Sequence, residues 1–198
     1  MNSGTLGTFV SCFLPLLAWS GQVTGKVSID ATAQHLAGAL VHVVSGVRPL
    51  TAPAKDNPPE FSVRGGRLSP EVLVVQTGQT FTVKNADNAA YNVHLRFREN
   101  KERNVALLPK GQLKGQADRP ELFARISEDL NRLNGYMCVM EHSFYALTDA
   151  AGAFTLRDLP PGTYTIEAVH PRHGRLQKEV VVTAANTSLE FMLPARSK

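Results

Sequence analysis

The feature that most constrains this chain is a two-residue alternation of apolar and polar side chains, which recurs in short segments bounded by Gly, Pro, Asn and Asp. It is clear in QTFTVKN, in YNVHLRF and in GTYTIEAV. A period of two places every second side chain on one face of a strand, so that one face can be buried. No segment carries the 3.6-residue period of a long amphipathic helix, and no fixed repeat occurs. The sequence therefore predicts an all-β fold of packed sheets.

The N-terminal segment predicts export. Residues 6–19 are apolar over a stretch shorter than the roughly 20 residues that cross a bilayer, and small and polar residues follow them. We expect a signal peptide over residues 1–21, a periplasmic or secreted mature chain, and no membrane span within it. No Lys or Arg precedes Leu6, which departs from the usual signal pattern. A lipoprotein signal at Cys12 is a weaker alternative, because this cysteine lies inside the apolar run.

Charge, cysteines and motifs exclude several classes of function. Lys and Arg number 21 against 17 Asp and Glu, a formal net charge of +4 without a long basic run, so nucleic acid is not an expected partner. Two cysteines, Cys12 and Cys138, cannot form a disulfide framework or a four-cysteine zinc site. The sequence contains no phosphate-binding glycine loop and no G-x-S-x-G or H-E-x-x-H motif. We therefore expect no enzymatic activity.

Three stretches interrupt the strand pattern. The Pro-containing residues 48–60 predict a linker, and the polar residues 98–121, which contain Gly and Pro, predict long loops. Residues 128–133 predict a short helical turn, with Ser127 as its N-cap and acidic residues in its first turn.

The C-terminal part carries a motif of known type. TDAAGAFTLRDLPPGTY resembles the carboxypeptidase regulatory-like family, whose fold is a transthyretin-like or carbohydrate-binding-like sandwich. The opening strands of that family resemble the segments that begin at Gly25 and Gly38. The resemblance implies a discontinuous sandwich formed by residues 22–47 and 145–194, interrupted by an inserted domain.

The insert, residues 61–140, resembles a second family. RLSPEVLVVQTGQTFTVKNAD and YNVH are similar to the cupredoxin-type module of methylamine-utilisation-like exported proteins. The resemblance implies a Greek-key β-sandwich. It places the four copper-ligand positions of that family on Tyr91, Ser127, Leu130 and Leu133. None of these side chains is a good copper ligand, so we expect a degenerate copper site, no metal and no other cofactor.

A shifted copper site is the alternative. Its ligands would be His94, Cys138 and His142, with Met140 or Met137 as the thioether. If residues 136–142 form one extended strand, Cys138 and His142 lie about 13 Å apart, and only a sharp bend would let both reach one ion. The other histidines, among them His42 and the pair His170 and His173, are expected to be ordinary solvated or hydrogen-bonded side chains.

The expected function is a binding or structural role at the cell envelope, with an envelope protein or a glycan as partner. Two alternatives remain: a periplasmic copper-binding or electron-transfer protein with the shifted ligands, and a carbohydrate-binding module. The low aromatic content of 7% disfavours the module, and the only tryptophan, Trp19, lies in the signal region.

Overall fold

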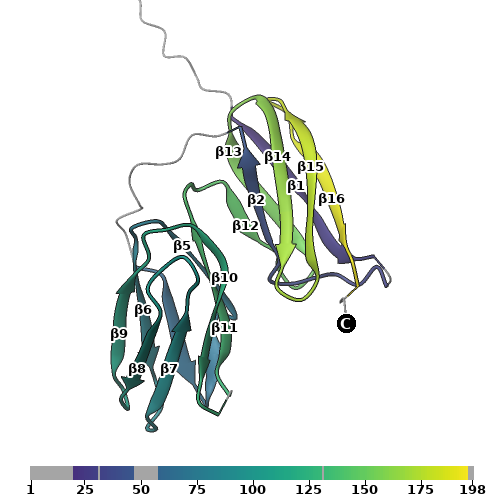
Figure 1. Cartoon of the computed structure of the whole chain (residues 1–198). Coiled ribbons are helices and arrows are strands. Elements are labelled where there is room, and N and C mark those ends of the chain that lie inside the picture. Colours follow the sequence, from purple (N-terminus) through teal and green to yellow (C-terminus); the bar gives the residue numbers. More distant parts are fainter. Residues whose placement is uncertain (1–19, 31, 47–57, 131, 196–198) are drawn as a thin grey trace, which may run out of the picture.

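A computed structural model describes residues 20–30, 32–46, 58–130 and 132–195. These residues form sixteen strands and no helix, so the all-β prediction is confirmed. The strands build two β-sandwiches that lie next to each other (Figure 1). Most of the predicted signal peptide and of the predicted linker falls outside the described residues. In the described part of the chain, no helix is long and apolar enough to cross a membrane.

The outer sandwich combines the two ends of the described chain. One sheet has the order β13-β1-β16 and the other the order β12-β2-β14-β15. Its strands are β1 (Gly21–Ile29), β2 (Leu40–Ser45), β12 (Tyr145–Leu147), β13 (Ala153–Leu159), β14 (Gly162–His170), β15 (Gly174–Val182) and β16 (Thr187–Leu193). β2 pairs with both β12 and β14, so the N-terminal strands and the C-terminal strands share one apolar core.

The inner sandwich contains the strands between β2 and β12. Its sheets have the orders β5-β11-β10-β7-β8 and β4-β3-β6-β9. The strands are β3 (Glu60–Arg64), β4 (Arg67–Ser69), β5 (Val72–Gln76), β6 (Thr80–Asn85), β7 (Tyr91–Arg96), β8 (Arg103–Leu107), β9 (Gln112–Gln116), β10 (Glu121–Glu128) and β11 (Asn134–Met140). Phe61 and Phe81, which are 0% and 1% exposed, fill the core between the two sheets.

Two local predictions are wrong. Residues 98–121 are not long loops, since they contain β8 and β9. Both strands lie at sheet edges, where a strand pairs on one side only and needs few apolar residues, so their alternation is weak. The helical turn over residues 128–133 does not form, because β10 continues through Glu128 and Ser127 pairs with Asn134 of β11 in place of capping a helix.

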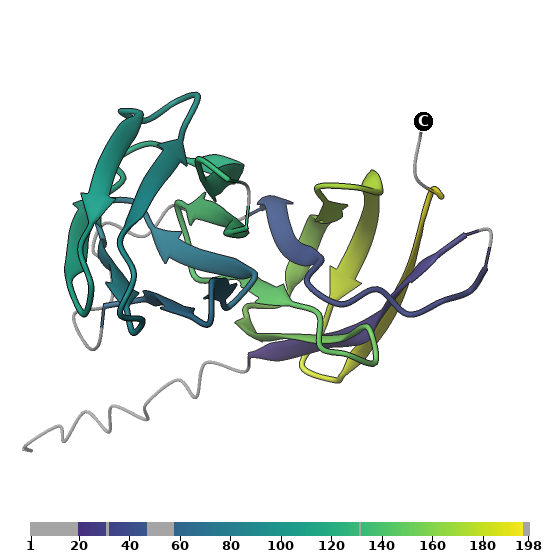
Figure 2. The same ribbon diagram turned by 90° about the horizontal axis from the view of Figure 1, so that it is seen from below.

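The two sandwiches meet at a third, smaller apolar cluster, which we call the junction (Figure 2). Its buried members are Leu40, Val72, Cys138, Met140 and Val169. An ion pair between Arg172 and Glu71, with an N–O distance of 3.5 Å, also joins the outer sandwich to the inner one. The junction positions the cleft described below.

Candidate functional site

The end of the inner sandwich where a copper site was expected is held together by a carboxylate. The Tyr91 hydroxyl donates a hydrogen bond to Asp87 at 2.8 Å. The same carboxylate accepts the backbone N–H groups of Gly65 and Gly66 at 2.7 and 2.9 Å. These two glycines have φ values of 60° and 69° and form the two-residue turn between β3 and β4, for which glycine is favoured. We call the group of Asp87, Tyr91, Glu128 and Arg132 the Tyr91 end.

Hydrogen bonding sets the protonation states at the Tyr91 end. The N–H groups of Gly66 and Gly65, followed by the Tyr91 hydroxyl, lower the pKa of Asp87. The pKa of Tyr91 is raised, first by its hydrogen bond to Asp87. Asp87 is therefore an ionised acceptor at neutral pH, and Tyr91 is a neutral donor. A phenol held in this way is a poor ligand for copper.

The turn between β10 and β11 is held by a second carboxylate. Glu128 is 4% exposed and accepts the N–H groups of Leu130 and Arg132 at 2.9 and 2.6 Å. Burial alone would raise the pKa of Glu128, but these two N–H groups and the Arg132 charge outweigh it and lower the pKa. The Arg132 guanidinium also lies 5.7 Å from the centre of the Tyr91 ring. Glu128, one of the acidic residues that suggested a helix start, therefore stabilises the turn after β10, whereas Asp129 is bonded to Asn92 and His94 of β7.

The structure does not bring the four expected ligand positions together. Ser127 lies opposite His94 of β7, and residues directly opposite each other share a face of the sheet. Tyr91 lies three residues from His94 along the same strand and therefore points to the other face. Leu133 is fully buried in the core of the inner sandwich, whereas Leu130 is 69% exposed.

The residues of the shifted copper site are separated as well. His94 Nε2 lies 2.6 Å from a carboxylate oxygen of Asp129. Ser127 of β10 lies between His94 of β7 and Asn134 of β11. Cys138 is four residues further along β11 and therefore about 13 Å from Asn134. His94 and Cys138 therefore cannot share an ion.

The other members of the shifted set are chemically unsuited to it. Cys138 is fully buried, and burial raises the pKa of its thiol to about 12, so that it is not a thiolate at neutral pH. His142 Nε2 lies 2.8 Å from the carbonyl oxygen of Val43, and its Nδ1 accepts the N–H of Phe144 at 3.2 Å. Both ring nitrogens are used, and neither is free for a metal. Within the described residues, no group of three or more His, Cys, Asp or Glu side chains could hold a metal ion.

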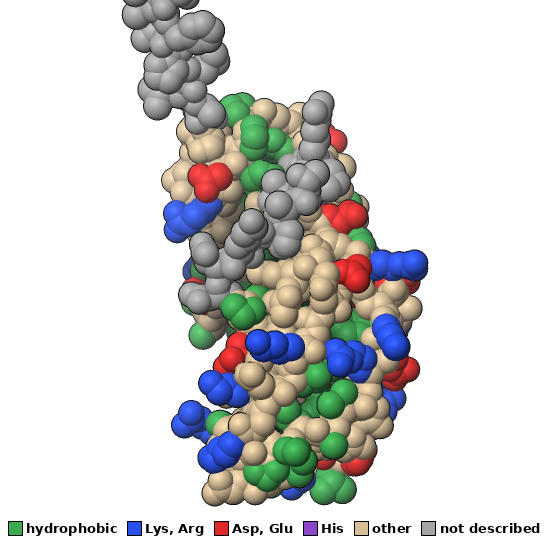
Figure 3. Space-filling view, turned by 90° about the vertical axis from the view of Figure 1, so that its left-hand side faces the viewer, with side chains coloured by type: hydrophobic (Ala, Val, Ile, Leu, Met, Phe, Trp, Pro, Cys, Tyr) green, Lys and Arg blue, Asp and Glu red, His purple; other side chains and the backbone are tan. Residues whose placement is uncertain are grey.

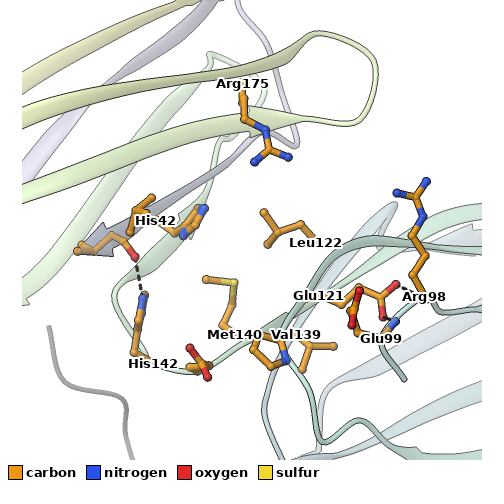
Figure 4. Close-up of a pocket in the computed structure, with 13 residues that line it drawn as sticks. His42, Arg98, Glu99, Glu121, Leu122, Val139, Met140, His142 and Arg175 are labelled. Carbon is orange, nitrogen blue, oxygen red and sulfur yellow. Dashed lines mark hydrogen bonds between the residues drawn. The ribbon is translucent and has the colours of Figure 1, made fainter. Parts of the chain in front are cut away.

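A cleft lies at one side of the junction, between the two sandwiches (Figure 4). Its volume is about 410 Å³. Leu122, Val139 and Met140 supply apolar surface from the inner sandwich. Arg175 of the outer sandwich and Arg98 of the inner sandwich lie on opposite sides of the opening, and Leu122 and Met140 point into the space between the sandwiches.

His42 lines the cleft on the side of the outer sandwich and is paired with a buried carboxylate behind it. His42 Nε2 lies 3.2 Å from a carboxylate oxygen of Glu167, which is 2% exposed. Gln177 donates a further hydrogen bond to Glu167 at 2.9 Å, and Arg175 lies 3.7 Å from it. Burial lowers the pKa of His42 and outweighs the opposing effect of Glu167. His42 is therefore neutral at pH 7.

The opposite wall carries carboxylates of the inner sandwich. Glu121 is 8% exposed and accepts the N–H groups of Arg98 and Glu99 at 2.6 and 3.1 Å. Glu99 and Glu141, by contrast, are exposed at the rim of the cleft. The cleft thus combines an apolar floor with guanidinium and carboxylate groups at its opening.

The sequence did not reveal which residues pair with one another at the Tyr91 end and at the cleft. His42 was expected to be an ordinary solvated or hydrogen-bonded side chain, and its partner Glu167, 125 positions away in the chain, was not identified. The only sequence signal for the pair is a histidine and a carboxylate in the middle of otherwise apolar strands, ALVHVV and TIEAVH. Such a pattern marks a buried polar pair but does not identify the partner.

Comparisons with known proteins concern the fold only. No protein-family model and no curated protein matches the chain. Among solved structures, the chain is similar to a copper-containing nitrite reductase from Thermus scotoductus SA-01, at 14% identity and a TM-score of 0.40, over 48% of this chain and 26% of that one. It is also similar to an oxidised amicyanin mutant, at 16% identity and a TM-score of 0.36, over 50% of this chain and 97% of that one.

A Cu(I) form of another amicyanin mutant is similar at 15% identity and a TM-score of 0.38, with the same two coverages of 50% and 97%. Each of these similarities covers about half of this chain. At such identities and TM-scores, they carry no conclusion about copper or activity. The resemblance of the outer sandwich to the carboxypeptidase regulatory-like family remains a prediction.

Proposed function

We propose that this chain is an exported, non-enzymatic β-sandwich protein of the cell envelope, which binds a small ligand in the cleft between its two sandwiches and holds no copper. The observation that carries the proposal is the cleft itself. Ligand sites in proteins are commonly concave, partly apolar and placed where domains meet, with a few polar groups that orient the ligand. The cleft at the junction has each of these properties.

The groups in the cleft favour a ligand with both charges and an apolar middle. Arg98 and Arg175 can bind a carboxylate, while Glu99 and Glu141 can bind an amine. Leu122 and Met140 offer apolar contact between them. A short zwitterionic peptide has this chemistry.

The side chains at the two sets of expected copper-ligand positions, and those in the cleft, support a protein that holds no copper and catalyses no reaction. The cupredoxin-like ligand positions carry a phenol, a hydroxyl and two aliphatic groups, and the shifted set is dispersed. Among the described residues that form the cleft, there is no Ser, Thr or Cys that the pair of His42 and Glu167 could activate as a nucleophile. The alternative of a copper-handling protein therefore lacks a set of ligands.

The test is an NMR titration of the chain with the tripeptide Ala-Leu-Ala. The expected result is a set of amide shift changes confined to Leu122, Met140 and their neighbours. In Leu122→Glu, a charge replaces the apolar contact, and the affinity should fall about tenfold, equivalent to about 1.4 kcal/mol. Leu108→Glu is the matched control, since Leu108 is 64% exposed and is not part of the cleft. Shift changes elsewhere, or an equal effect of both variants, would exclude the cleft as the peptide site.

A further inference from the structure

The outward face of the sheet β4-β3-β6-β9 carries unneutralised positive charge. Its cations are Arg64 on β3, Arg67 on β4, Lys84 on β6 and Lys114 on β9, and all four are exposed. Glu60, the only acidic residue in these four strands, is exposed on the same face, where it lies beside Thr82, so the four cations exceed the acidic residues by three. Within the described residues, none of the four cations forms an ion pair. We call this surface the basic face.

The strand register places the cations on one surface. Arg64 lies directly opposite Arg67 across the β3–β4 turn. Ser62, two residues before Arg64, lies beside both Ser69 and Lys84, and Lys84 is in turn opposite Gln112. Lys114 follows two residues after Gln112, opposite Thr82. Side chains two residues apart share a face, so all four cations point the same way.

Two arginines directly opposite each other repel, and like charges in this position destabilise a strand pair. The nearby Asp87 carboxylate is bonded to Gly65, Gly66 and Tyr91 and forms no ion pair with either arginine. Arg103 of β8 adds a fifth cation beside β9, where it donates to the carbonyl oxygen of Lys114 at 3.1 Å. An anionic partner would relieve the repulsion over the whole face.

The side chains between the cations indicate which anionic partner fits. Apart from Glu60 at one end of β3, they are hydroxyl and amide groups: Ser62, Ser69, Thr80, Gln112 and Gln116. The exposed large apolar residues of the described chain are Val44, Leu108, Leu130, Val181 and Met192, and none is on these strands, so the face lacks the apolar side chains that insert into a lipid surface. The aromatic residues of these strands, Phe61 and Phe81, are buried and cannot stack on nucleobases.

We propose that the basic face binds an acidic polysaccharide, with the arginines and lysines on its anionic groups and the Ser, Thr and Gln side chains on its hydroxyl groups. Figure 3 views the molecule from the side on which β9 lies in Figure 1, and Lys and Arg side chains gather there over the inner sandwich. The surface is separate from the cleft, so the two binding proposals stand or fall independently.

The experiment measures binding of the full chain to dextran sulfate at several NaCl concentrations, with neutral dextran, anionic phosphatidylglycerol vesicles and duplex DNA as further arms. The test variant carries four substitutions on the basic face: Arg64→Gln, Arg67→Gln, Lys84→Gln and Lys114→Gln. The control variant is Lys26→Gln, Arg96→Gln, Lys101→Gln, Arg157→Gln, which removes the same charge from exposed positions elsewhere. Circular dichroism verifies that both variants remain folded.

The expected result is binding to dextran sulfate and not to neutral dextran, weakening with salt with a log–log slope of about −3. The variant of the basic face should lose about 30- to 100-fold in affinity, and the control less than about 3-fold. In the unmodified chain, the amide shifts caused by dextran sulfate should map to β3, β6 and β9. Equal losses in the two variants, tighter binding to vesicles or DNA, or shifts on another surface would overturn the proposal.

Discussion

The Tyr91 end of the inner sandwich and the junction with its cleft both hold carboxylates by hydrogen bonds, but only the junction side has one whose partners are side chains. At the Tyr91 end, Asp87 accepts the backbone N–H groups of the β3–β4 turn, and Glu128 accepts those of the turn that follows it. In the cleft, Glu121 also accepts backbone N–H groups, but Glu167, behind His42, is bonded to the side chains of His42 and Gln177, and the Arg175 guanidinium lies 3.7 Å from it. Backbone donors are fixed by the fold, whereas long side chains can move toward a ligand.

We take the Tyr91 end as a structural site and the cleft as a site that can bind. At the Tyr91 end, hydrogen bonds and the buried Leu133 hold the side chains in place, beside an open hollow lined by Asp87, Tyr91 and Arg132. The cleft lies between the two sandwiches and has an apolar floor. The following predictions test whether the two regions really differ in this way.

The largest effect on stability should come from Leu133, a copper-ligand position of the resemblance that is buried in the core of the inner sandwich. Leu133→Ala should lower the free energy of unfolding by about 2–5 kcal/mol, because it leaves a cavity in the inner sandwich. Leu130→Ala, at the neighbouring expected ligand position, should change it by less than about 0.5 kcal/mol, since Leu130 is 69% exposed. Urea unfolding measures both values. Equal values for the two variants would mean that the turn is packed differently.

A smaller effect is expected for the hydrogen bond that closes the Tyr91 end. Tyr91→Phe removes a donor to the ionised Asp87 and should cost about 1–2 kcal/mol in urea unfolding. Arg175→Gln at the cleft should cost less than about 0.5 kcal/mol, because the side chain is 66% exposed and its ion pair is long. If Arg175→Gln cost more than Tyr91→Phe, the cleft would be the more structural of the two regions.

The two regions should also respond to different ranges of pH. His170 follows the junction residue Val169, and burial, followed by the charges of His173 and Arg172, lowers its pKa from 6.5 to about 4. The unfolded chain takes up this proton more readily, so the stability contributed by a neutral His170 is complete above pH 6.5 and is lost as the pH falls toward 4. With allowance for solvent screening, the loss should be about 1–2 kcal/mol.

The Tyr91 end should lose stability only at lower pH. The lowered pKa values of Asp87 and Glu128 contribute stability above their ordinary values of 3.8 and 4.5, and this contribution disappears as the pH falls below that range. In thermal unfolding from pH 7 to pH 3, His170→Gln should reduce the decline between pH 6.5 and 4, leaving the part contributed by His42, and should leave the later decline intact. If His170→Gln also abolished the loss of stability at lower pH, the two regions would be coupled.

The sequence predicted the all-β fold because the alternation in segments such as Thr80–Asn85 reports directly on one buried face. It failed at β8 and β9, where the strands lie at sheet edges and carry mainly polar residues. It also failed at Glu128, whose role as an acceptor for the following turn looks, in sequence, like the acidic start of a helix.

The sites were harder to predict than the fold. The resemblance indicated which positions lack copper ligands, but local spacing did not reveal that Ser127 and Tyr91 lie on opposite faces of their sheet. His42 and Glu167, and likewise His142 and Val43, meet across 125 and 99 positions, and such contacts depend on which distant strands pair, as β2 does with β14. No periodicity within a strand contains that information.

The most direct test of the account is the copper content and Cu(I) affinity of the purified full chain, measured by elemental analysis and by competition with a chromophoric chelator. The account predicts a colourless protein with substoichiometric copper and no binding beyond that of exposed histidines, and an unchanged result for Cys138→Ala. One tightly bound copper per chain, lost in Cys138→Ala, would contradict it and would show that a copper site forms around the junction.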